Sequence, residues 1–144
     1  HAMREEDVER IMQYPGTMIS SDGEIPVFGE GVLHPRSYGT YARVLGRYVR
    51  ERRLLRIEDA IRKMTSLPAQ RIQQFDRGLL RPGMKADVTI FDEDKIIDRA
   101  EFGDPHQYAE GVLYVIVNGE TVLDDGEMTK ARPGQVLYGL GKKR

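Results

Sequence analysis

The sequence predicts an α+β fold, with helices in the first half of the chain and a small antiparallel β unit in the second. Three observations carry this prediction. Apolar residues recur at helical spacing between residues 38 and 64. Short apolar or alternating runs follow residue 76, as expected of strands. Asn118-Gly119 separates two of these runs and favours a two-residue hairpin.

The first half begins with a predicted helix at residues 4–13, where Val8, Ile11 and Met12 share one face. Residues 17–20 are predicted to form a short strand. Residues 24–37 contain glycine and proline without periodicity, and so long a loop is uncommon unless it lines a site. Because one strand cannot make a sheet, this half resembles one end of a structure whose other strands lie elsewhere.

The clearest helix is predicted at residues 38–53. Its apolar face comprises Tyr41, Val44, Leu45, Tyr48 and Val49. A second helix follows at about residues 57–64, with Ser66-Leu67-Pro68 as its expected break. A shorter helix is predicted at residues 69–74, directly after the proline.

The second half is predicted to contain strands at residues 86–91, 112–117 and 121–123, with a last short strand at 135–137. Val112 to Val117 is apolar on both faces, which is typical of a strand buried between two layers. Residues 92–110 form a polar connection with few signals. The chain therefore divides near residue 76.

Composition excludes several classes of function. The chain of 144 residues is 40% hydrophobic and 31% charged, a balance typical of globular proteins. A net charge of -1 and the lack of a recognisable motif argue against a nucleic-acid partner. No apolar run reaches the roughly 20 residues of a membrane-spanning helix. The absence of cysteine excludes disulfides and favours a cytoplasmic location.

Asp22 is the sharpest candidate for chemistry. It follows the predicted strand in Ser20-Ser21-Asp22-Gly23 and precedes the long loop. In a parallel β/α barrel, catalytic groups lie at the carboxyl ends of strands, where a carboxylate can bind a metal or act as a general base. The competing interpretation is a turn aspartate, since Ser-Asp-Gly is common in turns. From these residues alone the turn is favoured.

His34 and Arg36 close the long loop. An imidazole can bind a metal or carry a proton, and a guanidinium can hold a carboxylate through two hydrogen bonds. Without further context, both are more typical of loop anchors. The sequence has no H-x-H and no H-E-x-x-H motif. A metal site would therefore need ligands other than Asp22 that this chain does not show.

An ordered series of segments resembles the C-terminal end of N-acyl-D-amino-acid deacylases, a branch of the amidohydrolase superfamily. The segments are residues 17–23, 33–36, 41–49, 60–69, 76–78, 80–83, 86–92 and 115–119. Each is weak alone, but together they cover nearly the whole chain in order. The resemblance implies a metal-dependent (β/α)8 barrel flanked by a small β-sandwich. Residues 1–75 would then be the end of the barrel, with its last strand and helices, and residues 76–144 the C-terminal part of the sandwich.

The resemblance also implies roles for individual residues. Asp22 matches the aspartate after the eighth barrel strand, which takes a proton from metal-activated water and passes it to the departing amine. Ser21 and Gly23 would shape its turn, and His34 and Arg36 match a motif near the substrate. Zinc is the metal that the family implies, and the remaining ligands would lie upstream. We therefore expect the substrate to be an N-acyl-D-amino acid and this chain alone to be inactive.

Two further hypotheses stay open. The chain could belong to a cyclic-amide hydrolase related to dihydropyrimidinase or dihydroorotase, or it could be an independent, non-catalytic interaction module. In either barrel interpretation the missing N-terminal part would be its principal partner. Uncovered helix faces and sheet edges then predict self-association of the isolated chain.

Overall fold

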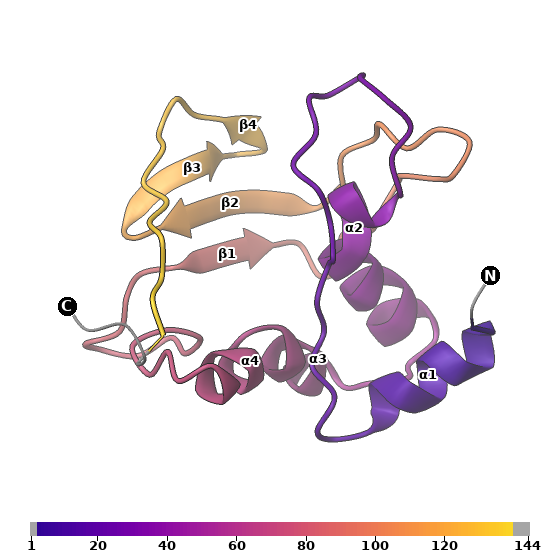
Figure 1. The fold of residues 1–144 in the computed structure, drawn as a ribbon, viewed down its shortest axis with the longest axis horizontal. Helices are drawn as coiled ribbons and strands as arrows, with labels where there is room; N and C mark the ends of the chain where they lie inside the picture. Colours follow the sequence, from indigo (N-terminus) through magenta and orange to yellow (C-terminus); the bar gives the residue numbers. More distant parts are fainter. Residues whose placement is uncertain (1–2, 140–144) are drawn as a thin grey trace.

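The computed structural model describes residues 3–139, and it places helices before strands along the chain (Figure 1). The helical elements are α1 (Glu5–Gln13), α2 (Arg36–Arg43), the π-helix η1 (Val44–Glu51), α3 (Ile57–Met64) and α4 (Ser66–Arg71). The strands are β1 (Val88–Phe91), β2 (Val112–Val117), β3 (Glu120–Asp124) and β4 (Glu127–Met128). The predicted α+β class is confirmed. Residues 1–2 and 140–144 of the two predicted domains lie outside the described residues.

Helix α1 confirms the first predicted helix and lies beside η1. Acidic residues fill its first turn, where the helix dipole favours negative charge. The hydroxyl of Tyr48 in η1 donates to a carboxylate oxygen of Glu5 at 2.9 Å. Met12 is buried, but Ile11 is half exposed, so the predicted apolar face is only partly covered.

Residues 17–20 run extended but are not a strand, so this element of the sequence prediction is wrong. A strand needs a hydrogen-bonded neighbour, and none of the described residues provides one beside this segment. The segment is instead tied to α3. The amide of Ile19 donates to the carbonyl oxygen of Lys63 at 3.1 Å, and the Lys63 ammonium donates to the carbonyl of Thr17 at 3.1 Å.

The helix predicted at residues 38–53 is continuous but changes its winding. It is α-helical in α2 and widens to a π-helix in η1, where the amide of Arg52 donates to the carbonyl of Arg47 at 2.9 Å, five residues back. Val44, Leu45 and Tyr48 are buried as predicted. Tyr41 is half exposed, which departs from the predicted face.

The break between the next two helices lies earlier than predicted. Thr65, with φ −129° and ψ −86°, ends α3, and α4 begins at Ser66. Ser66-Leu67-Pro68 therefore starts a helix instead of breaking one. A proline in the first turn removes no helical hydrogen bond, because the first amides have no partner within the helix.

The second half forms one antiparallel sheet in the order β1-β2-β3-β4. Asn118 and Gly119 both adopt positive φ, 50° and 85°, which confirms the predicted hairpin between β2 and β3. Strand β2 spans the predicted residues 112–117. The last strand lies at β4, not at residues 135–137, which form no regular element.

A small apolar core joins the helices to the connection between β1 and β2. Its buried members are Met12, Ala42, Val44, Leu45, Tyr48, Ala60 and Ile96. Strand β2 is only half-buried along its whole length, because the sheet packs as a single layer among residues 3–139. The sequence-predicted position of β2 between two layers therefore stays a prediction. The domain division at residues 75 and 76 is also untested.

Candidate functional site

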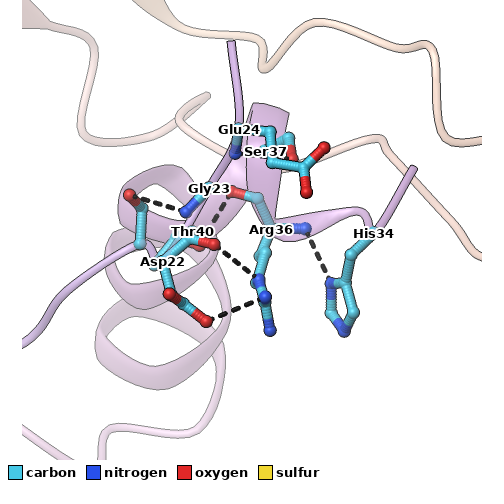
Figure 2. A network of polar contacts seen from close by, with 8 residues as sticks. Asp22, Gly23, Glu24, His34, Arg36, Ser37 and Thr40 are labelled. Atoms are coloured by element: carbon cyan, nitrogen blue, oxygen red, sulfur yellow. Dashed lines mark hydrogen bonds and ion pairs between the residues drawn. The ribbon is translucent and has the colours of Figure 1, made fainter. Parts of the chain in front are cut away.

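Asp22 and Arg36 meet at the two ends of the long loop. The backbone of Asp22 is left-handed, with φ 47°, a conformation that aspartate tolerates better than most residues. Its carboxylate oxygen Oδ2 lies 2.8 Å from Nη2 of Arg36, and its carbonyl oxygen accepts the Arg36 Nε–H at 2.8 Å (Figure 2). Arg36 is the first residue of α2. Its guanidinium therefore joins the end of the long loop to Asp22 at the loop's start.

Small polar residues support this closure. The Gly23 amide donates to Oγ of Ser21 at 3.2 Å, and the Glu24 amide donates to Oγ of Ser37 at 3.2 Å (Figure 2). A side chain at Gly23 would lie only 3.1 Å from the Ser37 Cα. The start of the loop therefore passes close to the start of α2, and glycine permits that approach.

His34 lies two residues before the helix that carries Arg36. Its Nδ1 accepts the backbone amide of Arg36 at 3.1 Å, and its carbonyl accepts the amide of Ser37 at 3.0 Å. The imidazole lies edge-on to Phe102, with ring centroids 4.9 Å apart. His34 thus sets the direction of α2, and the structure brings it together with Asp22, Ser21, Gly23 and Arg36.

The ion pair at this site is open to solvent. The Asp22 side chain is 81% exposed and that of Arg36 is 43% exposed. Exposed pairs contribute little to stability, so a ligand can compete for either partner at small cost. The carboxylate can accept and release a proton, and the guanidinium can bind a carboxylate of a ligand.

The described residues hold no group of three or more His, Cys, Asp or Glu side chains that could bind a metal ion. Asp22 can supply one oxygen ligand, but its neighbours are serine, glycine and arginine. Residues 3–139 therefore do not fit a complete zinc site, which needs at least three protein ligands.

A cleft of about 900 Å³ opens beside the pair. Its walls come from α1, the extended segment 17–20, the α2–η1 helix and the connection between β1 and β2. Val8, Ile11, Met12 and Ile19 contribute apolar surface. His34 and Arg36 line its edge, whereas Asp22 lies just outside its lining.

A cluster of aromatic rings next to the loop has no counterpart in the sequence predictions. Phe28 and Tyr38 pack against His106 and Tyr108 from the connection between β1 and β2. Burial and the neighbouring Tyr108 raise the pKa of Tyr38, so its hydroxyl stays a hydrogen-bond donor. His106 follows Asp104-Pro105 and reads as a plain loop residue, because its partners are as many as 77 positions away.

Comparison with known proteins places the chain in a family. A model described as the amidohydrolase family matches residues 19–123. The chain is 44% identical to an N-acyl-D-glutamate deacylase and 47% identical to an N-acyl-D-aspartate deacylase, both from Alcaligenes xylosoxydans xylosoxydans, over 136 residues. These matches cover 94% of this chain but only 27% and 26% of the relatives, so the chain spans about a quarter of their length.

Solved structures agree. An N-acyl-D-glutamate deacylase from Bordetella bronchiseptica, complexed with zinc and a phosphonate that mimics the tetrahedral intermediate, is 45% identical with a TM-score of 0.82. That match covers 94% of this chain and 28% of the other. A D-aminoacylase studied for its binuclear metal centre is 40% identical with a TM-score of 0.83, over 90% of this chain and 27% of that one. Sequence and fold together show that this chain belongs to the amidohydrolase family.

Proposed function

We propose that this chain is the C-terminal part of a metal-dependent deacylase that hydrolyses N-acyl-D-amino acids to a carboxylate and a free D-amino acid. One observation carries the proposal: 94% of the chain aligns at 44% and 47% identity with two deacylases of N-acyl-D-amino acids. Both relatives act on acyclic amides of D-amino acids, by their names. The cyclic-amide alternative finds no such support.

The proposal includes an architecture. Residues up to about 75 form the last strand and helices of a (β/α)8 barrel, and residues from 76 onward form part of a β-sandwich. Three features support it. The extended segment 17–20 pairs with no strand among the described residues, it lines an apolar cleft, and β2 is half-buried in a single-layer sheet. Each is the surface expected where further strands and helices pack.

In this architecture Asp22 lies at the carboxyl end of the last barrel strand, where catalytic groups gather. Water adds to the acyl carbonyl, the C–N bond breaks, and one proton must reach the departing nitrogen. Asp22 accepts the proton that the attacking water loses and delivers it to the amine. Its side chain is 81% exposed, and its ion pair with Arg36 is a contact that a substrate can displace before the carboxylate acts.

Arg36 and His34 bind substrate beside this carboxylate, and Ser21 and Gly23 hold the turn that presents it. The guanidinium of Arg36 suits the carboxylate that every N-acyl-amino acid carries. Its present partner is the exposed Asp22 carboxylate, which a substrate can displace. His34 keeps Arg36 in place through its bond to the Arg36 amide.

Zinc enters the proposal as the metal of the complete protein. A relative is crystallised with zinc, and another structure concerns a binuclear metal centre. Within residues 3–139, we propose only Asp22 as a zinc ligand. The remaining zinc ligands would come from other parts of the longer protein. A bound metal supplies Lewis acidity and an activated water. We therefore expect the isolated chain to be inactive.

The test is an assay of the longer protein encoded by the same reading frame. It is offered N-acetyl derivatives of D-glutamate, D-aspartate and D-leucine, their L-enantiomers, and the cyclic amides dihydrouracil and dihydroorotate. We expect release of free D-amino acid from the first set only. Turnover of a cyclic amide without turnover of the D-substrates would replace the proposal with its alternative. The isolated chain with added zinc serves as the negative control.

A further inference from the structure

Four rings join two loops that are distant in the sequence. Phe28 stacks on Tyr108, with ring centroids 4.8 Å apart and planes inclined by 22°. Tyr38 lies edge-on to His106 at 5.8 Å. Phe28 belongs to the loop of residues 24–35, Tyr38 belongs to α2, and His106 and Tyr108 belong to the connection between β1 and β2. In Figure 1 these two loops rise side by side next to α2.

His106 fastens this contact through both ring nitrogens. Nδ1 accepts the backbone amide of Gly29 at 3.1 Å and lies 3.0 Å from the Tyr38 hydroxyl. Nε2 lies 3.0 Å from the carbonyl oxygen of Gly31. An amide only donates and a carbonyl only accepts, so Nδ1 must be bare and Nε2 must carry the proton. These partners fix the ring as the neutral Nε2–H tautomer.

The loop held by His106 begins and ends at the candidate site. Asp22 precedes it and Arg36 follows it, and the two are joined at 2.8 Å. The same β1–β2 connection also contacts the end of the loop, through Phe102 against the imidazole of His34. The β1–β2 connection therefore contacts the loop in its middle, at Gly29 and Gly31, and near its end, at His34. Holding the middle of the loop restricts how its two ends, at Asp22 and Arg36, can approach each other.

We propose that His106 is a positioning residue, which holds the tip of the 24–35 loop and thereby keeps Asp22 and Arg36 in one orientation for catalysis. The inference rests on the proposed deacylase function. The hydrogen-bond partners of His106 are Gly29, Tyr38 and Gly31, and Asp22 is not among them. It acts through its hydrogen bonds to the backbone amide of Gly29 and the backbone carbonyl of Gly31. Among the described residues, no other side chain bonds these two backbone groups.

The hydrogen bonds of His106 to the backbone of Gly29 and Gly31, called the clasp below, are tested in the isolated chain. ¹⁵N NMR of the His106 ring should show the Nε2–H tautomer, and hydrogen exchange at the Gly29 amide should be slow. His106→Phe keeps an aromatic ring but removes both bonds, so the Gly29 amide should exchange at least about tenfold faster. Tyr108→Phe is the matched control, since it keeps the ring on Phe28. An Nδ1–H tautomer, or unchanged Gly29 exchange in His106→Phe, overturns the clasp.

Its effect on catalysis is tested in the longer protein. We expect His106→Phe to lower kcat per folded molecule about tenfold with a smaller change in KM. His106→Gln, which can still donate to Gly31, should recover part of kcat, and this rescue separates positioning from a loss of folded protein. Equal kcat in wild type and His106→Phe overturns the inference alone. No turnover of D-substrates by the wild type overturns the proposed function and, with it, this role.

Discussion

At the scale of single residues, Lys63 is the least expected feature. Its side chain is 1% exposed, yet it ends in a charged group. The ammonium donates to the carbonyl oxygens of Tyr14 and Thr17, at 2.5 and 3.1 Å. Lys63 therefore anchors the extended segment before Asp22 to helix α3. Burial lowers the pKa of Lys63, and the nearby Arg62 acts in the same direction.

This buried amine predicts a pH dependence of stability. Between the lowered folded pKa and the ordinary value of 10.5, the unfolded chain binds more protons than the folded one. Stability from Lys63 therefore rises as pH increases through that window and is lost as pH falls. We expect the difference in unfolding free energy between wild type and Lys63→Met to grow from pH 7 to 10.5, measured by urea denaturation.

The matched control is Lys95→Met, at an exposed lysine that pairs with Asp92. Subtracting each variant from wild type cancels the titration of the tyrosines, which also occurs at high pH. A difference between wild type and Lys63→Met that stays flat or shrinks with pH would contradict the role given to burial.

Arg36 allows function and stability to be separated. The Asp22–Arg36 pair is exposed, so Arg36→Lys should change the unfolding free energy by less than about 1 kcal/mol. Lysine lacks the planar fork, so the KM of the longer protein for N-acyl-D-amino acids should rise about tenfold. Arg56→Lys, at a similarly exposed pair with Asp59, should leave KM unchanged. An unaltered KM in Arg36→Lys would remove Arg36 from the substrate site.

Part of this candidate site could be predicted from the sequence. Asp22 stood out because it precedes glycine and follows an extended run, and the loop ending at Arg36 was visible from its glycines and prolines. His106 was not found, since its ring bonds backbone atoms that have no side-chain signature. Contacts across 75 and 77 positions leave no spacing pattern in a single sequence.

At the scale of elements, the sequence predicted the structure most accurately at turns, where the local residues decide the backbone conformation. Asn118-Gly119 placed the β2–β3 hairpin, because few residues tolerate its two positive φ angles. Residues 17–20 failed as a strand because pairing depends on neighbours that are not among the described residues. The π-helical winding of η1 carries no sequence periodicity distinct from an α-helix at this length.

Glycine substitutions test these turns. Gly111 has φ 83°, and an added Cβ would lie 2.5 Å from the Ile96 amide nitrogen. Gly119 has φ 85° with open space around it, whereas Gly103 has neither constraint. We expect Gly111→Ala to lose about 2–4 kcal/mol of unfolding free energy, Gly119→Ala about 1 kcal/mol, and Gly103→Ala less than about 0.5 kcal/mol. Thermal and urea unfolding would measure the order, and any other order would contradict the packing described.

At the scale of the whole molecule, the isolated chain exposes surfaces that proteins usually cover. The apolar cleft holds about 900 Å³, and Ile11 at its wall is half exposed. Within the described residues, no helix is long and apolar enough to cross a membrane. In a pure sample of the isolated chain, a second copy is the surface available to cover the apolar cleft.

We therefore expect the isolated chain to self-associate, with a mass above that of the monomer in size-exclusion chromatography with light scattering. Ile11→Glu places a charge in the cleft and should shift the population toward monomer. Ile72→Glu changes a comparably exposed isoleucine that does not line the cleft, and should have a smaller effect. A stable monomer at micromolar concentration would contradict this expectation.

The central claim is that Asp22 serves a deacylase of N-acyl-D-amino acids. Its most direct test is kcat/KM of the longer protein for N-acetyl-D-glutamate and its L-enantiomer, in wild type and Asp22→Asn. Asparagine also tolerates a left-handed backbone, so the substitution removes the charge and keeps the turn. We predict hydrolysis of the D-substrate alone and a loss of about 10²–10⁴-fold in Asp22→Asn. Full activity of Asp22→Asn, or no hydrolysis of N-acyl-D-amino acids by the wild type, would contradict the claim.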